Sequence, residues 1–486
     1  MDLRKRDLIV SVSLSVLLLI SSSFPCLVCA NGVFKVRRKF GGRGQSLYDL
    51  KAHDVRRRGR ILGAVDVHMG GLGLPSEAGL YFAEIGVGTP PKSYYVQVDT
   101  GSDILWVNCI GCRRCPRKSD LGIKLTLYDL KESSTGSVVT CDQPFCTSAF
   151  DGQIPGCSSD VPCQYSVLYG DGSTTTGYYV QDTLEYNLVT GNLQTAPANA
   201  TVVFGCGAQQ SGDLGSSSEA VDGILGFGQA NSSMLSQLAS AGKVKKMFAH
   251  CLDTVNGGGI FAIGHVVQPK MKTTPLVPNQ PHYNVNLKAI EVGNTVLNLP
   301  TDVFESGDRK GTIIDSGTTL AYLPDAVYTP LVDAILASQR SLSLQTVQEF
   351  TCFHFSGSVD DGFPPVTLHF EDSLTLTIYA HEYLFQIRED AWCLGWQNSG
   401  IQSKDAKDMI LLGDLALSNK LVFYDLVNQT IGWVDYNCSS SIKVQDEKTG
   451  AVYTVGAHNI SSATCMEFGI FTVLLLLTSM VLNLFF

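Results

Sequence analysis

The chain has 486 residues with 45 acidic and 35 basic side chains, which gives a net charge of -10; 44% of the residues are hydrophobic and 16% are charged. This length suits about two or three domains with large buried cores. The 47 glycines and 18 prolines indicate many turns, which favours an all-β fold over a helical bundle. An acidic surface repels phosphate, so nucleic acid is not an expected partner.

The first residues have the pattern of a secretory signal peptide. Three basic residues at positions 4–6 precede an apolar run from Leu8 to Ile20, and a short stretch of small residues ends at Ala30. This order is typical of a signal that is removed in the secretory pathway. Residues 1–30 are therefore predicted to be a signal peptide and are excluded from the fold.

A basic segment comes next. Residues 31–60 hold ten basic and two acidic residues, a net charge of +8, and residues 1–30 carry +1, which leaves -19 for the rest of the chain. We expect residues 31–78 to be a propeptide whose basic side chains pair with carboxylates of the acidic body at neutral pH. Acid would protonate these carboxylates and weaken the pairing. The alternative is a solvated basic arm that other proteases trim.

An internal repeat organises the body of the chain. The stretch Tyr95–Ser102 ends in Asp-Thr-Gly-Ser behind an apolar strand, and Gly311–Thr318 repeats this pattern with Asp-Ser-Gly-Thr. A second echo follows each copy, at Asp222–Gly226 and at Met409–Asp414. One such match arises easily by chance, but two copies with two echoes favour a function for the aspartates over ordinary turns.

Short alternating or apolar runs, separated by Gly, Pro, Asn and Ser, predict many strands. Helices are predicted at Ser233–Leu238 and Asp325–Ala337. Together with the repeat, this pattern predicts an all-β, bilobal fold with lobes at 79–280 and 281–440. The predicted strands include Leu80–Val87, Tyr165–Tyr169, Thr201–Phe204, Tyr283–Val292, Val366–Phe370 and Lys420–Asp425.

The repeated aspartates, Asp99 and Asp315, are the candidate catalytic residues. If Gly101 and Gly317 face each other, the missing Cβ atoms allow the two carboxylates to meet. Two carboxylates at close range share one proton, so their apparent pKa values separate. Such a pair can hold a water between a base and an acid and direct it at a carbonyl carbon. A hydroxyl three residues after each aspartate is expected to donate a hydrogen bond to it; these residues are Ser102 and Thr318.

A glycine-rich hairpin lies between the two copies of the repeat. Tyr169 ends a strand-like run and is followed by Gly170, Asp171 and a second glycine. A hairpin of this kind can cover a cleft and exclude water from it. Trp106, which follows the first aspartate, is expected in the core and as a hydrogen-bond donor to a residue of this flap. An ordinary hairpin tyrosine is the alternative interpretation of Tyr169.

Of the 15 cysteines, twelve remain when the three in the predicted signal and tail are set aside. An even number in a secreted chain predicts up to six disulfides, whose pairing the sequence alone does not give. The cluster Cys109, Cys112 and Cys115 has no histidines nearby, so disulfides are expected there rather than zinc. Five Asn-X-Ser/Thr triplets predict glycosylated surface loops; they begin at Asn199, Asn231, Asn428, Asn437 and Asn459.

The last residues have the pattern of an attachment signal. Phe468–Phe486 contains no charged residue and is long enough to span a bilayer as a helix. Because no basic residue follows this run, and because small residues precede it at Ser461 and Ser462, we expect a GPI-attachment signal, with a transmembrane helix as the alternative. The expected parts are a linker at 441–463 and a removed tail at 464–486, and the expected location is the extracellular side of the plasma membrane.

Taken together, the motifs over about residues 79–440 resemble those of the pepsin-like aspartic endopeptidases, and the cysteine-rich insertion at 109–163 is most similar to their nepenthesin-type plant branch. The resemblance implies a bilobal acid-protease fold with a central cleft and Asp99 and Asp315 as its catalytic pair. It also implies that Tyr169 is the flap tyrosine, supported by Trp106. The leading hypothesis is therefore hydrolysis of a polypeptide substrate without a cofactor or a metal. Because one chain supplies both aspartate turns, a monomer is expected.

The resemblance also implies two disulfides, Cys352–Cys393 and Cys206–Cys438. One alternative function stays open, a catalytically silent protein that binds a partner in the cleft of the same fold. Both aspartates and their hydroxyl neighbours are present, which favours the enzyme.

Overall fold

The computed structural model describes residues 63–73, 75, 79–149, 156–217, 219–307, 310–399 and 408–460. All of these residues belong to one structural unit, which begins at Arg60. The predicted signal peptide, residues 31–62 of the predicted propeptide, the predicted tail, and Ser461 and Ser462 lie outside the described residues. Within the described part of the chain, no helix is both long and apolar enough to cross a membrane.

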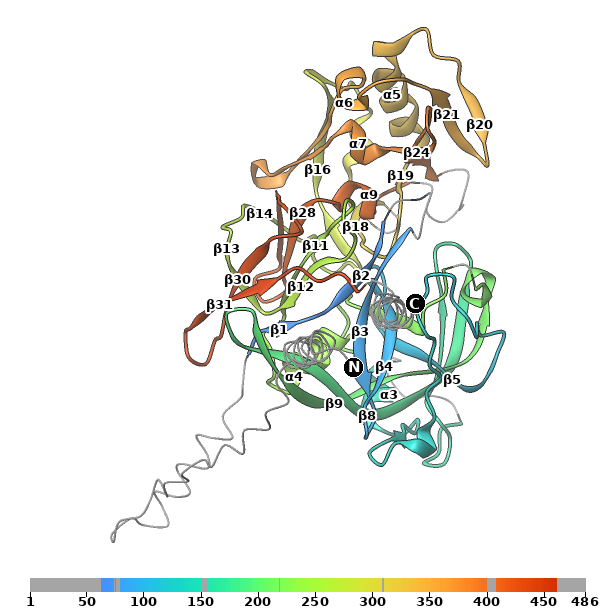
Figure 1. The fold of residues 1–486 in the computed structure, drawn as a ribbon, viewed down its shortest axis with the longest axis vertical. Helices are drawn as coiled ribbons and strands as arrows, with labels where there is room; N and C mark the ends of the chain where they lie inside the picture. The colour runs from blue at the N-terminus through green and yellow to red at the C-terminus, as the bar shows by residue number, and fades with distance from the viewer. Residues whose placement is uncertain are drawn as a thin grey trace, which may run out of the picture. The chain divides into compact units, whose positions relative to one another are not determined.

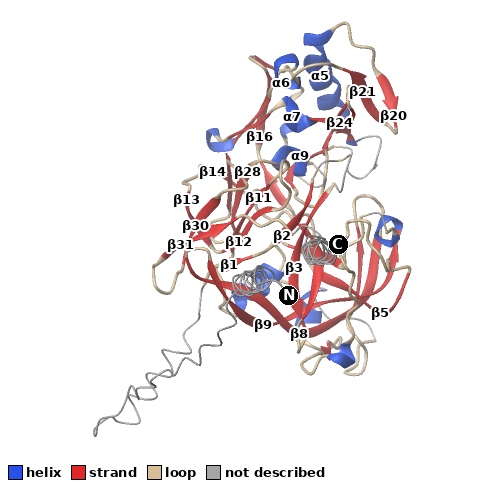
Figure 2. Cartoon of the chain, viewed as in Figure 1, coloured by secondary structure: helices blue, strands red, loops and turns tan. Residues whose placement is uncertain are grey.

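Strands dominate both lobes (Figure 1, Figure 2), which confirms the predicted all-β class. The two predicted helices are present as α4 (Met234–Ser240) and α5 (Asp325–Leu336). The Ser233 hydroxyl accepts a hydrogen bond from a backbone N–H of the first turn of α4, as is usual for a residue that begins a helix. The other helices with defined bounds among the described residues are α3 Pro144–Ala149, α6 Val359–Gly362, α7 Ala380–Tyr383 and α9 Asp414–Leu417, with 3-10 turns η1 Leu130–Glu132, η2 Gly212–Gly215, η3 Thr301–Phe304, η4 Ala337–Gln339 and η5 Glu371–Ser373.

The first lobe is built on one large sheet with a long antiparallel hairpin, β8 (Thr174–Gly191) and β9 (Gln194–Ser211), at its centre. Threonine, tyrosine and valine are frequent in β8, and such residues favour extended backbone. The other strands of this sheet are β1 Val65–Asp66, β2 Met69–Leu72, β3 Leu80–Val87, β4 Lys92–Asp99, β5 Leu105–Arg113, β6 Ser137–Val138, β7 Gln164–Leu168, β10 Gly223–Gly226, β11 Met247–Leu252, β12 Gly259–Ile263, β14 Thr273–Pro275, β28 Lys420–Asp425 and β29 Thr430–Asp435. The main path runs β14-β29-β28-β11-β12-β1-β8-β9-β5-β10-β4-β3-β2, so strands of the second lobe extend the sheet of the first.

The second lobe contains three smaller sheets among the described residues. Its strands are β15 Tyr283–Val285, β16 Leu287–Val292, β17 Thr295–Val296, β18 Gly311–Ile314, β19 Ala321–Leu323, β20 Gln345–Val347, β21 Phe350–His354, β22 Val366–Phe370, β23 Thr375–Ile378, β24 Leu384–Arg388, β25 Ala391–Leu394, β26 Trp396–Asn398 and β27 Met409–Leu412. The strand orders are β15-β18-β27-β19-β26, β17-β16-β22-β23 and β20-β21-β25-β24.

The structure differs from the predicted boundaries at both ends of the described chain. Residues 65–72, placed in the propeptide by the sequence, form β1 and β2; β1 pairs with both β8 and β12, and β2 pairs with β3. The predicted linker is wrong for its first part, because β30 (Ser441–Gln445) and β31 (Val452–Gly456) form a sheet with β13 (His265–Gln268). The alternation in β30, with Ile442 and Val444 buried, is the signal that predicts a strand there.

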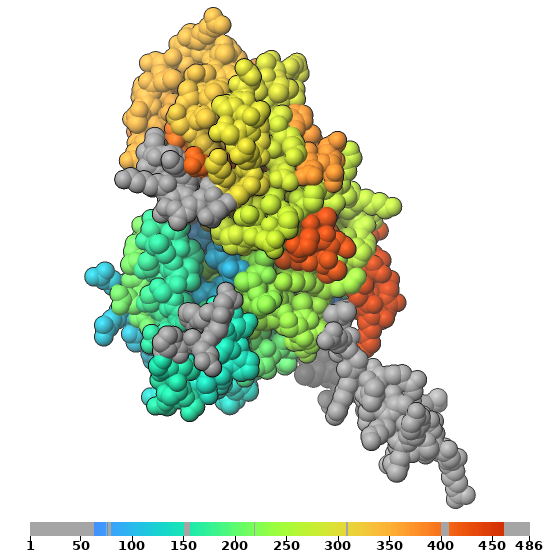
Figure 3. Space-filling model, turned by 180° about the vertical axis from the view of Figure 1, so that it is seen from behind, coloured from blue at the N-terminus to red at the C-terminus, as the bar shows by residue number. Residues whose placement is uncertain are grey.

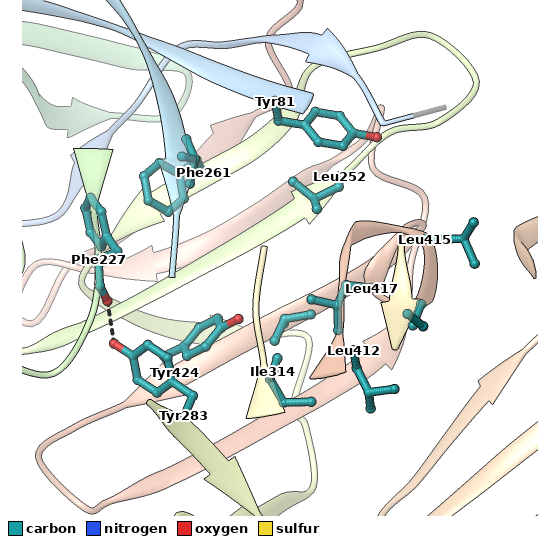
Figure 4. Packing of buried hydrophobic residues seen from close by; sticks show 14 of the residues in the cluster. Tyr81, Phe227, Leu252, Phe261, Tyr283, Ile314, Leu412, Leu415, Leu417 and Tyr424 are labelled. Carbon is teal, nitrogen blue, oxygen red and sulfur yellow. Dashed lines mark hydrogen bonds between the residues drawn. The ribbon is translucent and has the colours of Figure 1, made fainter. Parts of the chain in front are cut away.

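Aromatic residues form a core that joins the two lobes. Phe227 and Phe248 come from the first lobe and Tyr283 and Tyr424 from the second, and all four are buried. Phe248 stacks on Tyr424 with 4.2 Å between ring centroids. The Tyr283 hydroxyl donates a hydrogen bond of 2.6 Å to the Phe227 carbonyl (Figure 4). Since burial of one large apolar side chain stabilises a fold by about 1.5–3 kcal/mol, this core contributes strongly to holding the lobes together.

All twelve cysteines of the predicted set form disulfides, which confirms the expected six, and the cluster that begins at Cys109 is disulfide-bonded as expected. The predicted pair Cys352–Cys393 is present, because these two residues lie opposite each other on β21 and β25. The predicted pair Cys206–Cys438 is wrong. Cys206 on β9 lies beside β5 and bonds to Cys109, and Cys438 bonds to Cys251 on β11. The remaining pairs are Cys112–Cys115, Cys141–Cys157 and Cys146–Cys163.

Candidate active site

The two aspartates of the repeat end equivalent strands of the two lobes. Asp99 is the last residue of β4, and Asp315 directly follows β18. The second echo in each lobe is the parallel neighbour of that strand: β10 runs beside β4, and β27 runs beside β18. Backbone hydrogen bonds connect the end of each echo strand to the aspartate turn, since the Phe227 N–H donates to the Asp99 carbonyl at 2.8 Å and the Asp315 N–H donates to the Leu412 carbonyl at 3.0 Å. The two echoes therefore hold the aspartate turns in place.

The glycines bring the two turns into contact, as expected from the repeat. A Cβ at Gly101 would lie 2.6 Å from Oδ2 of Asp315, and a Cβ at Gly317 would lie 2.0 Å from Oδ1 of Asp99. Both distances are shorter than any non-bonded contact a real side chain tolerates. Each glycine thus faces the aspartate of the other lobe, and the two carboxylates share one buried site.

Three groups around Asp99 decide its proton affinity. The Gly101 N–H donates a 2.8 Å hydrogen bond to Oδ1, and the Ser102 hydroxyl donates to Oδ2. Burial first, and the negative charge of Asp315 second, raise the pKa of Asp99 to about 7, against the opposing effect of these donors. Below that pH the pair therefore retains a proton, as the sequence predicts for a carboxylate dyad.

The second turn repeats this arrangement around Asp315. The Gly317 N–H donates to Oδ1 at 2.8 Å, and the Thr318 hydroxyl donates to Oδ2 at 2.8 Å. The Ser316 N–H crosses between the lobes and donates to the Thr100 hydroxyl at 2.8 Å. Neither Thr100 nor Ser316 was among the predicted site residues, although both copies of the repeat have a hydroxyl residue at the second position of the motif. These two residues lock the turns together.

A buried carboxyl group near the pair was also absent from the predicted site residues. Asp414 begins α9 and is buried, and its N–H donates to the Thr318 carbonyl at 2.7 Å. Burial, followed by the charges of Asp315 and Asp99, raises the pKa of Asp414 well above its ordinary value. An acidic residue just after the apolar run of β27 and Gly413 was the available signal. Burial and the two neighbouring carboxylates thus disfavour a third negative charge at Asp414 beside the dyad.

The predicted flap is a hairpin of β7 and β8. At its tip the Tyr169 N–H donates to the Ser173 carbonyl at 2.9 Å, and Gly172 has φ +83°, a conformation that favours glycine. The exposed Asp171 accepts a 2.8 Å bond from the Ser173 N–H. Gly170 is exposed, and no described atom lies within 4 Å of the Cβ it lacks. The tip therefore stands clear of the rest of the described structure.

The flap tyrosine is connected to the core as predicted. Nε1–H of the buried Trp106 donates a 2.7 Å hydrogen bond to the Tyr169 hydroxyl. Burial, and then the charge of Asp99, raise the pKa of Tyr169, so this hydroxyl keeps its own proton as a donor. This connection links the hairpin to the strand that follows the first aspartate turn.

The five predicted glycosylation sites are all exposed, at Asn199, Asn231, Asn428, Asn437 and Asn459. Exposure is what attachment of a glycan requires. The surface position of these triplets is therefore confirmed, and their modification stays a prediction.

Both lobes match family models. Residues 81–265 match the xylanase inhibitor N-terminal model, and residues 282–435 match the xylanase inhibitor C-terminal model. The chain is 54% identical to aspartic proteinase 36 from Arabidopsis thaliana over 438 residues, which cover 90% of each chain. It is 27% identical to aspartic proteinase nepenthesin-2 from Nepenthes gracilis over 82% of this chain and 88% of the relative.

Among solved structures, the chain resembles that of edgp, with a TM-score of 0.62 and 22% identity over 77% of this chain and 95% of the other. At that identity the likeness supports the bilobal β fold alone. The relatives and the two family models together cover both lobes and both aspartate turns. The chain belongs to the plant aspartic proteinase family, in the group that matches the xylanase inhibitor models and is related to nepenthesin.

Proposed function

We propose that the protein is an aspartic endopeptidase that hydrolyses peptide bonds with Asp99 and Asp315. The observation that carries this proposal is the contact between the two glycine turns, where each missing Cβ makes room for the carboxylate of the other lobe. A structural protein has no need for two carboxylates at such close range, because their mutual repulsion costs stability. The family membership supports the same activity.

The proposed mechanism follows from the one proton that the two carboxylates share. The ionised carboxylate takes a proton from a water molecule that attacks the carbonyl carbon of the substrate. The protonated carboxyl donates a hydrogen bond to the developing oxyanion and then helps the leaving amine to depart. Because burial and the charge of Asp315 raise the pKa of Asp99 to about 7, the pair retains one shared proton in acid. No step requires a cofactor or a metal.

The substrate is a polypeptide that lies between the lobes under the flap. The surface is hollowed between the first lobe, coloured blue to green, and the second lobe, coloured yellow to orange (Figure 3). In the proposed function, the exposed tip with Gly170 and Asp171 closes over an extended substrate, and Tyr169 forms the inner side of that cover. Closure would exclude bulk water from the dyad.

A binding protein on the same fold is the second candidate function. It is favoured by the names of the two matching family models, which describe xylanase inhibitors. The dyad argues against it, since a cleft that only holds a partner requires no paired carboxylates.

We further propose that the enzyme passes through the secretory pathway and is held at the cell surface by a GPI anchor. Six disulfides between described residues support an oxidising compartment. The uncharged run 468–486 and the small residues at 461–463 support attachment near Ser461 or Ser462. Release of the protein from membranes by a phosphatidylinositol-specific phospholipase would support the anchor, and retention after that treatment would favour a transmembrane helix.

The activity can be tested with protein purified from a secretory host that expresses the full-length sequence. Cleavage of an unfolded protein substrate is measured from pH 3 to 7 for the wild type, for Asp99→Asn and Asp315→Asn, and for the matched exposed control Asp302→Asn. We expect acid-active cleavage in the wild type and the control, and a loss of at least about 1000-fold in both dyad variants. A folded wild type without its propeptide that cleaves no substrate would favour the binding protein.

A further inference from the structure

A cluster of two histidines and one aspartate lies outside the aspartate site. Asp66 is the last residue of β1, His68 follows two positions later, and His458 follows β31. The potential ligand atoms of these three side chains all lie within 4.8 Å of one another. Asp66 is buried, and the two histidines are partly buried. In the described part of the chain this is the one group of its kind.

The side chains of the cluster already contact one another. Nε2 of His458 lies 3.0 Å from both carboxylate oxygens of Asp66. The rings of His68 and His458 have their centroids 4.1 Å apart at an interplanar angle of 37°. Two imidazoles and one carboxylate therefore converge on one point from two distant parts of the sequence.

The backbone around the cluster is fixed by strand pairing. Asp66 pairs with Ala262 of β12 and Asn187 of β8. The backbones of His458 and Gly259 exchange two hydrogen bonds of 2.8 Å. The ligands are thus held on rigid elements, as a metal site with defined geometry requires.

We propose that Asp66, His68 and His458 bind one Zn²⁺ ion. Imidazole nitrogen and carboxylate oxygen are common zinc ligands, and three protein ligands leave the fourth tetrahedral position for water. Zinc–ligand distances of about 2.0–2.2 Å place neighbouring ligand atoms roughly 3.3 Å apart. The Asp66–His458 separation of 3.0 Å is close to this value, and the ligand atom of His68 lies within 4.8 Å of the other two.

The surroundings of the cluster provide access for the ion. Asp66 and His68 line a cavity of about 250 Å³, whose lining also includes Glu84, Glu185 and Lys92. With Asp66, the carboxylates in that lining outnumber the single lysine, which favours the entry of a cation.

The proposed ion would connect the two ends of the described chain. Asp66 and His68 belong to the segment that contains β1 and β2, and His458 lies 392 residues further along than Asp66. The Ile460 N–H, beside His458, also donates to the Met69 carbonyl at 2.8 Å. Because an ion that binds only the folded state stabilises it, zinc would hold the β1–β2 segment against the last strands and raise the Tm.

Isothermal titration calorimetry with ZnCl₂ at pH 7 tests the proposal on protein expressed from the full-length sequence without a histidine tag and freed of metal by a chelator. We expect one zinc ion per chain with a Kd of about 10 µM or tighter, and at least a tenfold weaker Kd in Asp66→Asn, His68→Gln and His458→Gln. The matched control is His354→Gln, because His354 forms a 3.1 Å pair with Asp390 but lies outside the cluster; its Kd should equal that of the wild type.

Two further measurements make the result decisive. Thermal unfolding with and without ZnCl₂ should show a higher Tm with zinc in the wild type and in His354→Gln, and little change in the three cluster variants. Unfolding in chelator alone reports whether each variant is folded. Wild-type protein that binds no zinc, or cluster variants that bind it as tightly as the wild type, would overturn the proposal. Because neither readout uses catalysis, this result is independent of the proteolytic function.

Discussion

Gly101 and Gly317 are the residues that allow two carboxylates from different lobes to occupy one site. Each lacks the Cβ atom that would overlap the opposite aspartate; a Cβ at Gly101 would lie 2.6 Å from Asp315, and a Cβ at Gly317 would lie 2.0 Å from Asp99. Glycine is therefore required at both positions for a steric reason, because the overlap is with a residue of the other lobe. The reason for glycine is different at Gly172, where the positive φ of the backbone itself favours this residue.

We predict that Gly317→Ala lowers kcat/KM by at least about 100-fold, because the added methyl group displaces Asp99 and a shift of about 1 Å is sufficient to disrupt such a site. The measurement is steady-state cleavage of a peptide at acidic pH, with circular dichroism as a check of folding. Gly307→Ala is the matched control, since no described atom lies within 4 Å of its added Cβ. Equal activity in the two variants would contradict the steric argument.

The raised pKa of Asp99 also affects stability. Its ordinary value is 3.8 and its value in the folded chain is about 7, so between these pH values the folded chain holds a proton that the unfolded chain has lost. The stability that this group contributes is therefore fully present below about pH 3.8 and is lost as the pH rises toward 7.

Asp99→Asn removes this titration, so we predict that the Tm of the variant relative to the wild type increases from pH 4 to pH 8. Scanning calorimetry at several pH values measures the difference. The exposed Asp302→Asn provides a control whose Tm difference from the wild type should stay nearly constant. A difference for Asp99→Asn that is independent of pH would show that the proton affinity of the dyad is not linked to folding.

At the scale of secondary-structure elements, β1 and β2 change the interpretation of the basic segment. Both strands lie inside the expected propeptide, yet β1 fills the position between β8 and β12 in the large sheet. Removal of β1 would leave buried backbone groups of two strands without partners, which is costly. The part that activation removes should therefore end before Gly63, close to the basic run at 56–60.

We predict that N-terminal sequencing of the mature protein gives a start between residues 57 and 63. A protein purified after acid activation is the appropriate sample, and a protein held at neutral pH is its control. A start at or after residue 73 would contradict the prediction, because the mature polypeptide would then lack β1 and β2, or would retain them only as a separate, non-covalently bound fragment.

At the scale of the whole molecule, disulfides restrain the chain over very different distances. Cys251–Cys438 closes a separation of 187 residues between the first lobe and the segment after β29, whereas Cys112–Cys115 closes a separation of 3. A cross-link that closes a longer loop removes more conformational entropy from the unfolded chain.

We predict that the double variant Cys251→Ser/Cys438→Ser loses about 2–5 kcal/mol of stability, and that Cys112→Ser/Cys115→Ser loses clearly less. Thermal unfolding of both variants beside the wild type provides the comparison. Equal losses would show that local packing around the sulfur atoms, rather than loop length, sets the contribution of these bonds.

Much of the fold follows from local patterns. Strands such as Leu80–Val87, Val366–Phe370 and Lys420–Asp425 begin and end where the sequence predicts, because alternation, apolar content and flanking turn residues are local properties. The prediction missed β30 and β31 because residues 441–463 were assigned to a linker before the tail, and it assigned β1 and β2 to a segment chosen by its charge. The net charge of a segment does not predict whether its residues pair with strands elsewhere in the chain, as β1 and β2 do.

The sequence alone determined the two aspartate turns and their hydroxyl neighbours, because a repeated motif with its own strand signals is fully contained in local residues. Only the tertiary structure decided which residues from distant positions meet: Cys206 with Cys109 rather than with Cys438, Asp414 behind the dyad, and His458 beside Asp66. Pairings across such separations depend on strand order in the sheets, and strand order is a property of the whole packed chain.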